Sequence, residues 1–144
     1  MHILFDIGAT KTRIAVLRAD KDNFELPVVY HTPASYQDGM KVLREHIVSL
    51  ADGSAVDSIV GGIAGHWDNE FGTIKNSGNL ADWDDKPIAE DLAGEEHTPL
   101  YIDNDAAIAG LGEAIFGAGK DMRRMLYMTV SSGVGGAIIE QGEI

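Results

Sequence analysis

The sequence of 144 residues contains no cysteine and only four prolines. Without cysteine the chain can form neither disulfides nor thiolate metal sites, which is compatible with a reducing compartment. Basic residues are also scarce, since 11 lysines and arginines stand against 23 aspartates and glutamates, a formal net charge of −12. This imbalance argues against binding to nucleic acid or to an anionic membrane, because both are bound through basic side chains.

Long hydrophobic runs are missing as well. The apolar N-terminal stretch is interrupted by Asp6, Lys11 and Arg13, so it predicts neither a signal peptide nor a membrane-spanning helix. The chain is 44% hydrophobic, enough to bury a core, and its length fits one domain of about 100–200 residues. We therefore expect a soluble, cytoplasmic domain with no membrane and no nucleic-acid partner.

The most informative segment, residues 6–16, is an apolar strand, a turn of small and hydroxyl residues, and a second strand. A turn this sharp brings backbone N–H groups together at one point, which favours phosphate binding. Thr10, Lys11 and Thr12 add hydroxyls and an ammonium group. Asp6 precedes the turn and is placed to hold a hydrated Mg²⁺. An ordinary hairpin with a glycine turn is the alternative interpretation.

Residues 129–137 repeat this pattern of strand, hydroxyls with glycines, and strand. Ser131 and Ser132 offer hydroxyl donors, and glycines such as Gly133 allow a ligand to approach the backbone closely. Taken alone, this segment is better explained as a glycine-rich hairpin turn. Together, the two turns predict a pair of loops that hold one triphosphate from opposite sides.

A third polar segment, residues 103–105, follows a short apolar run and opens a predicted helix. Transfer of a phosphoryl group to a hydroxyl requires a carboxylate that accepts the hydroxyl proton, and Asp105 is the candidate. Helix capping is the alternative, because Asn and Asp favour the start of helices for local reasons.

The remaining pattern predicts a mixed sheet with helices packed on it. Periodicity predicts strands at 2–7, 12–18, 24–30, 58–64, 100–102, 125–130 and 137–139, and helices at 36–50, 87–92 and 105–116. The last helix is expected to bury Ile108, Leu111, Ile115 and Phe116. Residues 65–83 have no clean period and are predicted to be a functional loop.

These motifs resemble the ROK family of sugar kinases and repressors, within the actin-like ATPase superfamily. The family pattern D-I-G-G-T-K is similar to DIGATK at residues 6–11, and its G-x-P/A-G loop to GIAG at 62–65. Its N-L-x-x-W element matches NLADW at 79–83, and its E-N-D-A-N motif is similar to DNDAA at 103–107. Its T-x-G-T-G-I-G-G-G-I segment is similar to residues 129–138. The order and spacing agree over essentially the whole chain.

The resemblance implies an α/β domain of the actin-like ATPase (ribonuclease H-like) type, with a mixed sheet flanked by helices. It further implies ATP-dependent phosphorylation of a hexose or hexose derivative, with Asp105 as catalytic base. By resemblance, the sugar ligands are Gly65, Asn79, Asn104 and Asp105, and the phosphate contacts are Gly8, Thr10, Lys11, Ser132 and Gly133. Ala9 departs from the family glycine, which matters if that position requires a positive φ.

ROK proteins are about twice this long. The chain is therefore expected to be an N-terminal portion, with one lobe over 1–119 and the opening hairpin of a second lobe over 120–144. The family's zinc site of His and Cys would lie in the missing half. We expect the 144-residue chain to bind sugar weakly and to turn over little ATP, and its free hairpin to pack on the lobe or to pair with another copy as a homodimer.

Two further classes remain open: a ROK-type sugar sensor that regulates transcription, and an actin-like ATPase module. The acidic charge opposes DNA binding, and the Asn104–Asp105 pair with Asn79 favours a sugar enzyme over an ATPase.

Overall fold

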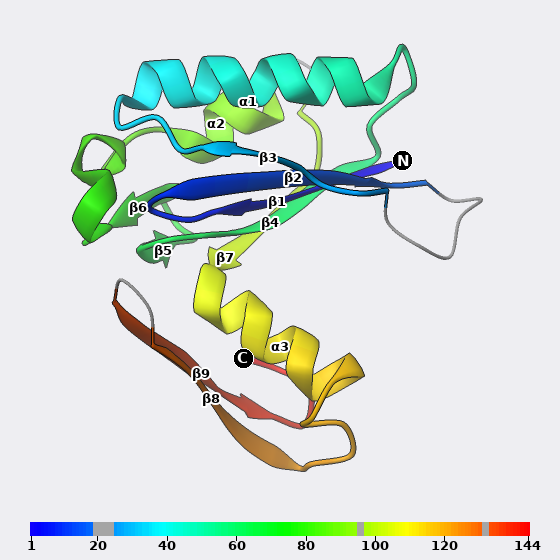
Figure 1. Ribbon diagram of the computed structural model, residues 1–144, viewed down its shortest axis with the longest axis vertical. Helices are drawn as coiled ribbons and strands as arrows, with labels where there is room; N and C mark the ends of the chain where they lie inside the picture. Colours follow the sequence, from blue (N-terminus) through cyan, green and yellow to red (C-terminus); the bar gives the residue numbers. More distant parts are fainter. Residues whose placement is uncertain (19–24, 95–96, 131–132) are drawn as a thin grey trace.

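The computed structural model describes residues 1–18, 25–94, 97–130 and 133–144. Its centre is a five-stranded sheet in the order β3-β2-β1-β4-β7 (Figure 1). The strands are β1 (His2–Ile7), β2 (Lys11–Leu17), β3 (Val28–His31), β4 (Ser58–Ile63) and β7 (Leu100–Asn104). The first three strands form an antiparallel meander, and β4 and β7 run parallel to β1. The mixed sheet predicted from the sequence is thus confirmed.

Side chains of a strand alternate between the two faces of the sheet, so every second side chain points toward the helices. Ile3 and Ile7 of β1 and Ile14 of β2 are fully buried there, whereas Lys11 and Arg13 of β2 project to the opposite face. β4 is buried nearly throughout, as expected for a parallel strand with neighbours on both sides.

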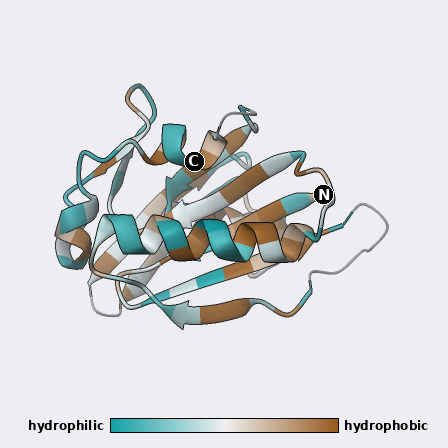
Figure 2. Cartoon of the chain, turned by 90° about the horizontal axis from the view of Figure 1, so that it is seen from above, coloured by the Kyte–Doolittle hydropathy of each residue, from teal (hydrophilic) through white to brown (hydrophobic). Residues whose placement is uncertain are grey.

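Two helices, α1 (Tyr36–Ala51) and α2 (Ile88–Ala93), cover this buried face, and α1 lies over the strands (Figures 1 and 2). Ser35 caps the start of α1, where its side chain accepts a hydrogen bond from the N–H of Asp38. Asp52 ends the helix in the left-handed region with φ of 47°. Both ends agree with the helix predicted at 36–50.

Residues 65–83 are more ordered than the predicted loop. They form a small hairpin of β5 (His66–Asp68) and β6 (Thr73–Lys75), followed by the 3₁₀ segment η1 (Gly78–Trp83). Trp83 is buried, donates a hydrogen bond from Nε1 to the carbonyl of Pro33, and meets Tyr36 edge-to-face with ring centroids 5.4 Å apart. Strands of three residues are too short to give a periodic signal, which is why the pattern did not reveal them.

The helix α3 (Asp105–Phe116) leaves the end of β7 on the other side of the sheet, and the hairpin β8 (Arg124–Val130) and β9 (Val134–Glu140) packs against it (Figure 1). The predicted buried face of α3 was wrong. Ile115 and Phe116 are exposed, and the buried residues are Ala106, Ala107 and Gly110. Small residues are needed because a Cβ at Gly110 would lie 2.8 Å from Cβ of Tyr127.

Among the residues that the structure describes, no helix combines the length and hydrophobicity that a membrane span needs.

Candidate functional site

A cavity of about 720 Å³ opens at the carboxyl ends of β1, β4 and β7. Because parallel strands end at the same edge of a sheet, the segments that follow them meet there. Four stretches line the cavity: the β1–β2 turn, the loop after β4 with the start of η1, the β7–α3 junction, and the β8–β9 hairpin. The predicted site residues in its lining are Asp6, Gly8, Thr10, Lys11, Gly65, Asn79, Asn104, Asp105 and Gly133.

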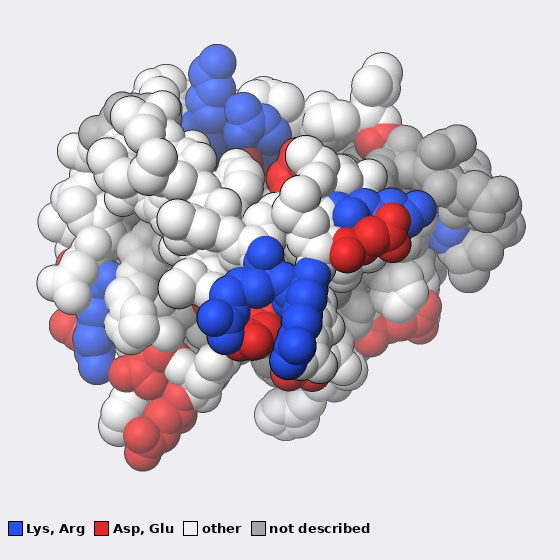
Figure 3. Space-filling model, turned by 90° about the horizontal axis from the view of Figure 1, so that it is seen from below, with Lys and Arg blue, Asp and Glu red and all other residues white. Residues whose placement is uncertain are grey.

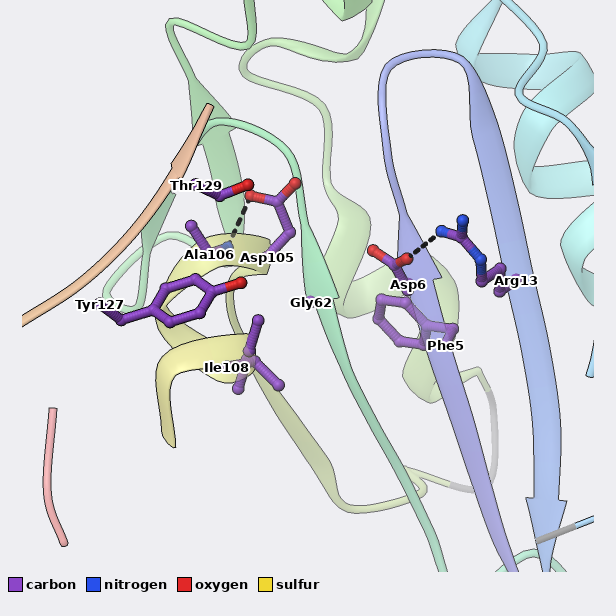
Figure 4. Close-up of a pocket in the computed structure, with 10 residues that line it drawn as sticks. Phe5, Asp6, Arg13, Gly62, Asp105, Ala106, Ile108, Tyr127 and Thr129 are labelled. Carbon is purple, nitrogen blue, oxygen red and sulfur yellow. Dashed lines mark hydrogen bonds and ion pairs between the residues drawn. The ribbon is translucent and has the colours of Figure 1, made fainter. Parts of the chain in front are cut away.

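A second hollow of about 490 Å³ adjoins the first and shares Asp6, Arg13, Asp105, Ala106 and Thr129 with it. Figure 4 shows the two acids on either side of Gly62 in β4, with Asp6 coming from β1 and Asp105 from the start of α3. The two glycine-bearing turns and the acid at the helix start therefore face a common space.

The β1–β2 turn is held by a hydrogen bond within it and by another from Thr32. The N–H of Gly8 donates to the carbonyl of Lys11 at 3.0 Å, and the Thr32 hydroxyl donates to the carbonyl of Gly8 at 2.7 Å. No described residue accepts a hydrogen bond from the backbone N–H of Ala9 or Thr10, so these two donors are left for a ligand. Ala9 does not have a positive φ, so alanine replaces the family glycine without backbone strain.

Thr12 is the predicted contact that the structure places elsewhere. Its side chain is 2% exposed, lies on the helical side of the sheet, and forms a hydrogen bond of 2.9 Å between its hydroxyl and that of Thr32. Alternation along β2 turns Thr12 away from the face that carries Lys11. Its position supports the turn rather than a ligand.

The β7–α3 junction separates a capping residue from a residue that faces the cavity. Asn104 caps α3: its side-chain oxygen accepts hydrogen bonds from the N–H groups of Ala106 and Ala107 at 3.0 and 3.1 Å. Its amide nitrogen donates to the carbonyl of Gly65 at 2.8 Å. The capping alternative is thus correct for Asn104, whose amide fixes the junction. The adjacent Asp105 lines both hollows.

Two glycines of β4 and its loop allow this arrangement. A Cβ at Gly62 would lie 2.8 Å from Cα of Asp105, so only glycine lets the start of α3 approach β4 this closely. Gly65 has φ of +114°, and a Cβ there would meet Ser77 at 3.1 Å. Gly62 therefore sets the distance between β4 and the acid, and Gly65 sets the distance between its own loop and Ser77.

The loop after β4 is held by an ion pair. The Lys75 ammonium lies 2.9 Å from Oδ2 of Asp68, and this hydrogen bond lowers the pKa of Asp68 and raises the pKa of Lys75. Beyond this hairpin, Asn79 is exposed and reaches the cavity together with Asn76, which is in the left-handed region. Asn76 was not predicted as a site residue, because it directly follows a hairpin that the sequence pattern did not reveal.

Arg13 is a second residue that the sequence analysis missed. Its Nη1 lies 2.7 Å from Oδ2 of Asp6, directly across the β1–β2 ladder, and both side chains line both hollows (Figure 4). The available signal was the alternation of β2, which puts Lys11 and Arg13 on one face.

The second turn reaches the cavity through Gly133, Val134 and Gly135, and Thr129 joins them from β8. The predicted hydroxyl donors Ser131 and Ser132 lie outside the described residues. A Cβ at Gly135 would lie 3.0 Å from Cβ of Ala106, so the turn packs closely on the first turn of α3.

The acidic residues at the cavity fit a Mg²⁺ ion that is held mainly by phosphate and water. No group of three His, Asp or Glu side chains in the described part of the chain could hold a metal by itself. Asp6 is a half-exposed carboxylate at the cavity, which Asp105 also lines. Mg²⁺ is usually bound by one or two carboxylates together with substrate phosphates and water, and this mode requires no more than Asp6 offers.

With the geometry established, three comparisons with known proteins bear on it. The profile of the ROK family matches residues 3–144. A glucokinase from Halalkalibacterium halodurans is 31% identical, over 99% of this chain and 45% of that protein. A beta-glucoside kinase from Listeria monocytogenes is also 31% identical, over 97% of this chain and 47% of that protein.

Among solved structures, a ROK family glucokinase from Streptomyces griseus in complex with glucose and AMPPNP superimposes with a TM-score of 0.84. It is 26% identical and is matched over 99% of this chain and 45% of that one. The chain belongs to the ROK family and has the actin-like ATPase fold predicted for it. It spans about half the length of the relatives it matches.

Proposed function

We propose that the protein phosphorylates a hexose or hexose derivative with ATP, and that this chain supplies the catalytic carboxylate and two phosphate-binding turns. The observation that carries the proposal is the single cavity in which Asp105, the β1–β2 turn and the Asn79 loop meet. The similar proteins named glucokinase and beta-glucoside kinase support it, as does the relative in complex with glucose and AMPPNP.

In this proposal Asp105 is the general base. It accepts the proton of the sugar hydroxyl as that oxygen bonds to the terminal phosphorus and the bond from phosphorus to the ADP oxygen breaks. The position of Asp105 is fixed by its neighbours, because Asn104 ties the start of α3 to the carbonyl of Gly65. Such fixed placement is a main contribution of the protein to phosphoryl transfer, where alignment of the reacting atoms dominates.

The phosphate side is assigned to the β1–β2 turn and to Gly133 of the second turn. The free N–H groups of Ala9 and Thr10, the Thr10 hydroxyl and the Lys11 ammonium are donors for phosphate oxygens. Asp6 would hold Mg²⁺ through water, and the metal would supply positive charge at the phosphates. The sugar side is assigned to Gly65, Asn79 and Asp105, with Asn104 chiefly in a positioning role.

We also propose that residues 1–119 form one lobe and that 120–144 open a second one. In the described residues β8 and β9 pair only with each other, and they contact the first lobe mainly through α3. A sugar enzyme is favoured over an ATPase module by the asparagines at the cavity, and over a regulator by the net charge of −12.

The test is a hexose panel with ATP, in a chain that carries both halves of the protein and in its Asp105→Ala variant. We expect phosphorylation in the parent chain and a loss of at least about 100-fold in the variant, with sugar binding retained. Phosphorylation that survives in Asp105→Ala would remove Asp105 as the base. Absence of activity on every sugar, with sugar binding intact, would favour the sensor.

A further inference from the structure

We infer that Arg13 is a phosphate ligand, and that Asp6 holds its guanidinium when no nucleotide is bound. On nucleotide binding the guanidinium would exchange the Asp6 carboxylate for phosphate oxygens. The inference rests on the proposed kinase function and adds a residue that the family motif does not assign.

Asp6 and Arg13 lie where a polyphosphate would bind. Asp6 and Arg13 are register partners on β1 and β2, and the ion pair between them spans 2.7 Å at the wall shared by the two hollows. Arg13 projects from the same face of β2 as Lys11, about 7 Å along the strand, because two residues of a strand rise about 3.4 Å each. Two cations with this spacing can bind neighbouring groups of one polyphosphate.

Most N–H donors of the Arg13 guanidinium stay open to a ligand. A guanidinium carries five N–H groups, and Asp6 is the only described residue that accepts a hydrogen bond from Arg13. The Arg13 side chain is 51% exposed and that of Asp6 is 44% exposed. An ion pair exposed to this degree contributes little free energy, so a ligand can displace it readily.

The charges at the cavity also favour Arg13 as a phosphate ligand. Lys11 and Arg13 are the cations of the cavity, and Asp6 and Asp105 are the acids that oppose them. A protein with a net charge of −12 repels a polyphosphate at long range, so local cations must offset this. A guanidinium suits that role because its planar fork can donate two hydrogen bonds to one phosphate. If Arg13 stayed paired with Asp6 when the polyphosphate binds, Lys11 would be the only cation of the cavity lining available to the phosphate charges.

The test measures binding of metal-free tripolyphosphate to the 144-residue chain by NMR titration, with EDTA present. This probe isolates phosphate binding from magnesium, from adenine and from turnover. Arg13→Gln should weaken binding about tenfold, the effect of removing a charged hydrogen bond. Asp6→Asn should tighten binding several-fold, because it frees the guanidinium and removes a repelling carboxylate. The gain from Asp6→Asn should shrink in the double variant, since the two effects are coupled.

The chain offers a closely matched control. Arg124 and Glu140 are also register partners on adjacent antiparallel strands and form an exposed ion pair at 2.8 Å, but they do not line either hollow. Arg124→Gln removes the same charge and the same kind of pair, and should change tripolyphosphate binding less than twofold. The side-chain Nε–H signal of Arg13 should shift on titration, while that of Arg124 stays in place.

The outcomes separate the two proposals. If the parent chain binds tripolyphosphate and Arg13→Gln binds it equally well, the role of Arg13 is overturned and the kinase proposal stands. If the parent chain shows no binding, the phosphate site of the proposed function fails, and the inference with it. Arg13→Lys guards against a folding defect, because it keeps the charge, loses the fork and should bind between the parent and Arg13→Gln.

Discussion

The five-stranded sheet and the β8–β9 hairpin use the same alternation of side chains, but their two faces are covered differently. In the sheet, Ile3, Ile7 and Ile14 are fully buried beneath α1 and α2. In the hairpin, one face packs on α3 while the other leaves five apolar side chains 62–73% exposed. These are Leu126, Met128, Val130, Val134 and Ile138. Figure 3 shows the molecule from this side, where much of the surface is uncharged.

The comparison shows that alternation of apolar side chains along a strand does not ensure that these side chains are buried. Alternation fixes which side chains share a face of a strand, but a face is buried only if another element covers it. A contiguous apolar surface of this kind is typical of interaction sites. The hairpin sequence therefore has the composition of a strand pair covered on both faces, although the described residues cover only one.

The largest expected effect comes from the covered face. Ile3→Ala should lower the free energy of unfolding by about 2–5 kcal/mol, because it removes buried methylenes and leaves a cavity. Leu126→Ala, of similar volume change on the open face, should cost about 0.5 kcal/mol or less. Urea unfolding of both variants measures the contrast. Equal losses would mean that the outer face of the hairpin is buried in solution.

Two glycines of α3 next test the contact between this helix and the β8–β9 hairpin. Gly110→Ala should destabilise the chain by about 1–3 kcal/mol, since its Cβ would lie 2.8 Å from Tyr127 and 2.9 Å from Ile139. Gly112→Ala has open space around its Cβ and should stabilise α3 by up to about 1 kcal/mol. Thermal unfolding of the pair distinguishes the packed side of the helix. A loss at both positions would contradict the assigned helix face.

A pH-dependent effect should appear on the helical side of the sheet. Burial and the hydrogen bond from the Tyr36 hydroxyl to the Asp91 carboxylate raise the pKa of Tyr36 above its ordinary value of 10.0. A raised folded-state pKa contributes stability below pH 10 that is lost as the pH increases, because only the unfolded chain then releases the proton.

The stability of the parent chain relative to Tyr36→Phe should therefore fall above pH 10, by at most about 1.4 kcal/mol per pH unit. Urea midpoints of the two proteins between pH 8 and 11.5 give this difference, in which the other tyrosines cancel. A constant difference over that range would show that Tyr36 ionises equally in both states.

The smallest change in stability is expected on the open face of the hairpin. Leu126→Gln with Met128→Gln should shift the free energy of unfolding by less than about 0.5 kcal/mol, as is usual for exposed positions. If the apolar face drives association, the same variant should lower the weight-average mass in sedimentation equilibrium. An unchanged mass for parent and variant would assign no self-association to this surface.

Much of the fold is predictable from local signals. The alternation in β1 and β2, the period of α1 and the serine at its start all act over a few residues, and the structure confirms them. The same signals failed for α3, where four large apolar residues pointed to one face and the hairpin selected the face of Ala106 and Gly110 instead. The β8–β9 hairpin packs so closely on α3 that large side chains do not fit between them. The sequence of α3 alone does not reveal this contact.

Some residues of the site were also predictable from local signals, and others were not. The motifs alone pointed to Asp105 and to the β1–β2 turn, and both lie at the cavity. Local reasoning did not separate Asn104, whose amide caps the helix, from its neighbour, and it did not exclude Thr12, which the pleat turns toward Thr32. Arg13 was missed because its partner comes from the preceding strand.

The strand–turn–strand units, the helix starts and the family can be recognised without coordinates, since they follow from short-range hydrogen bonding, alternation and residue identity. That residues near 6, 65, 79, 105 and 133 line one cavity follows from the fold alone. The physical reason is the parallel pairing of β1, β4 and β7, which joins strands far apart in the chain and brings their carboxyl ends to one edge. The pairing of Asp6 with Arg13 depends on the same long-range register.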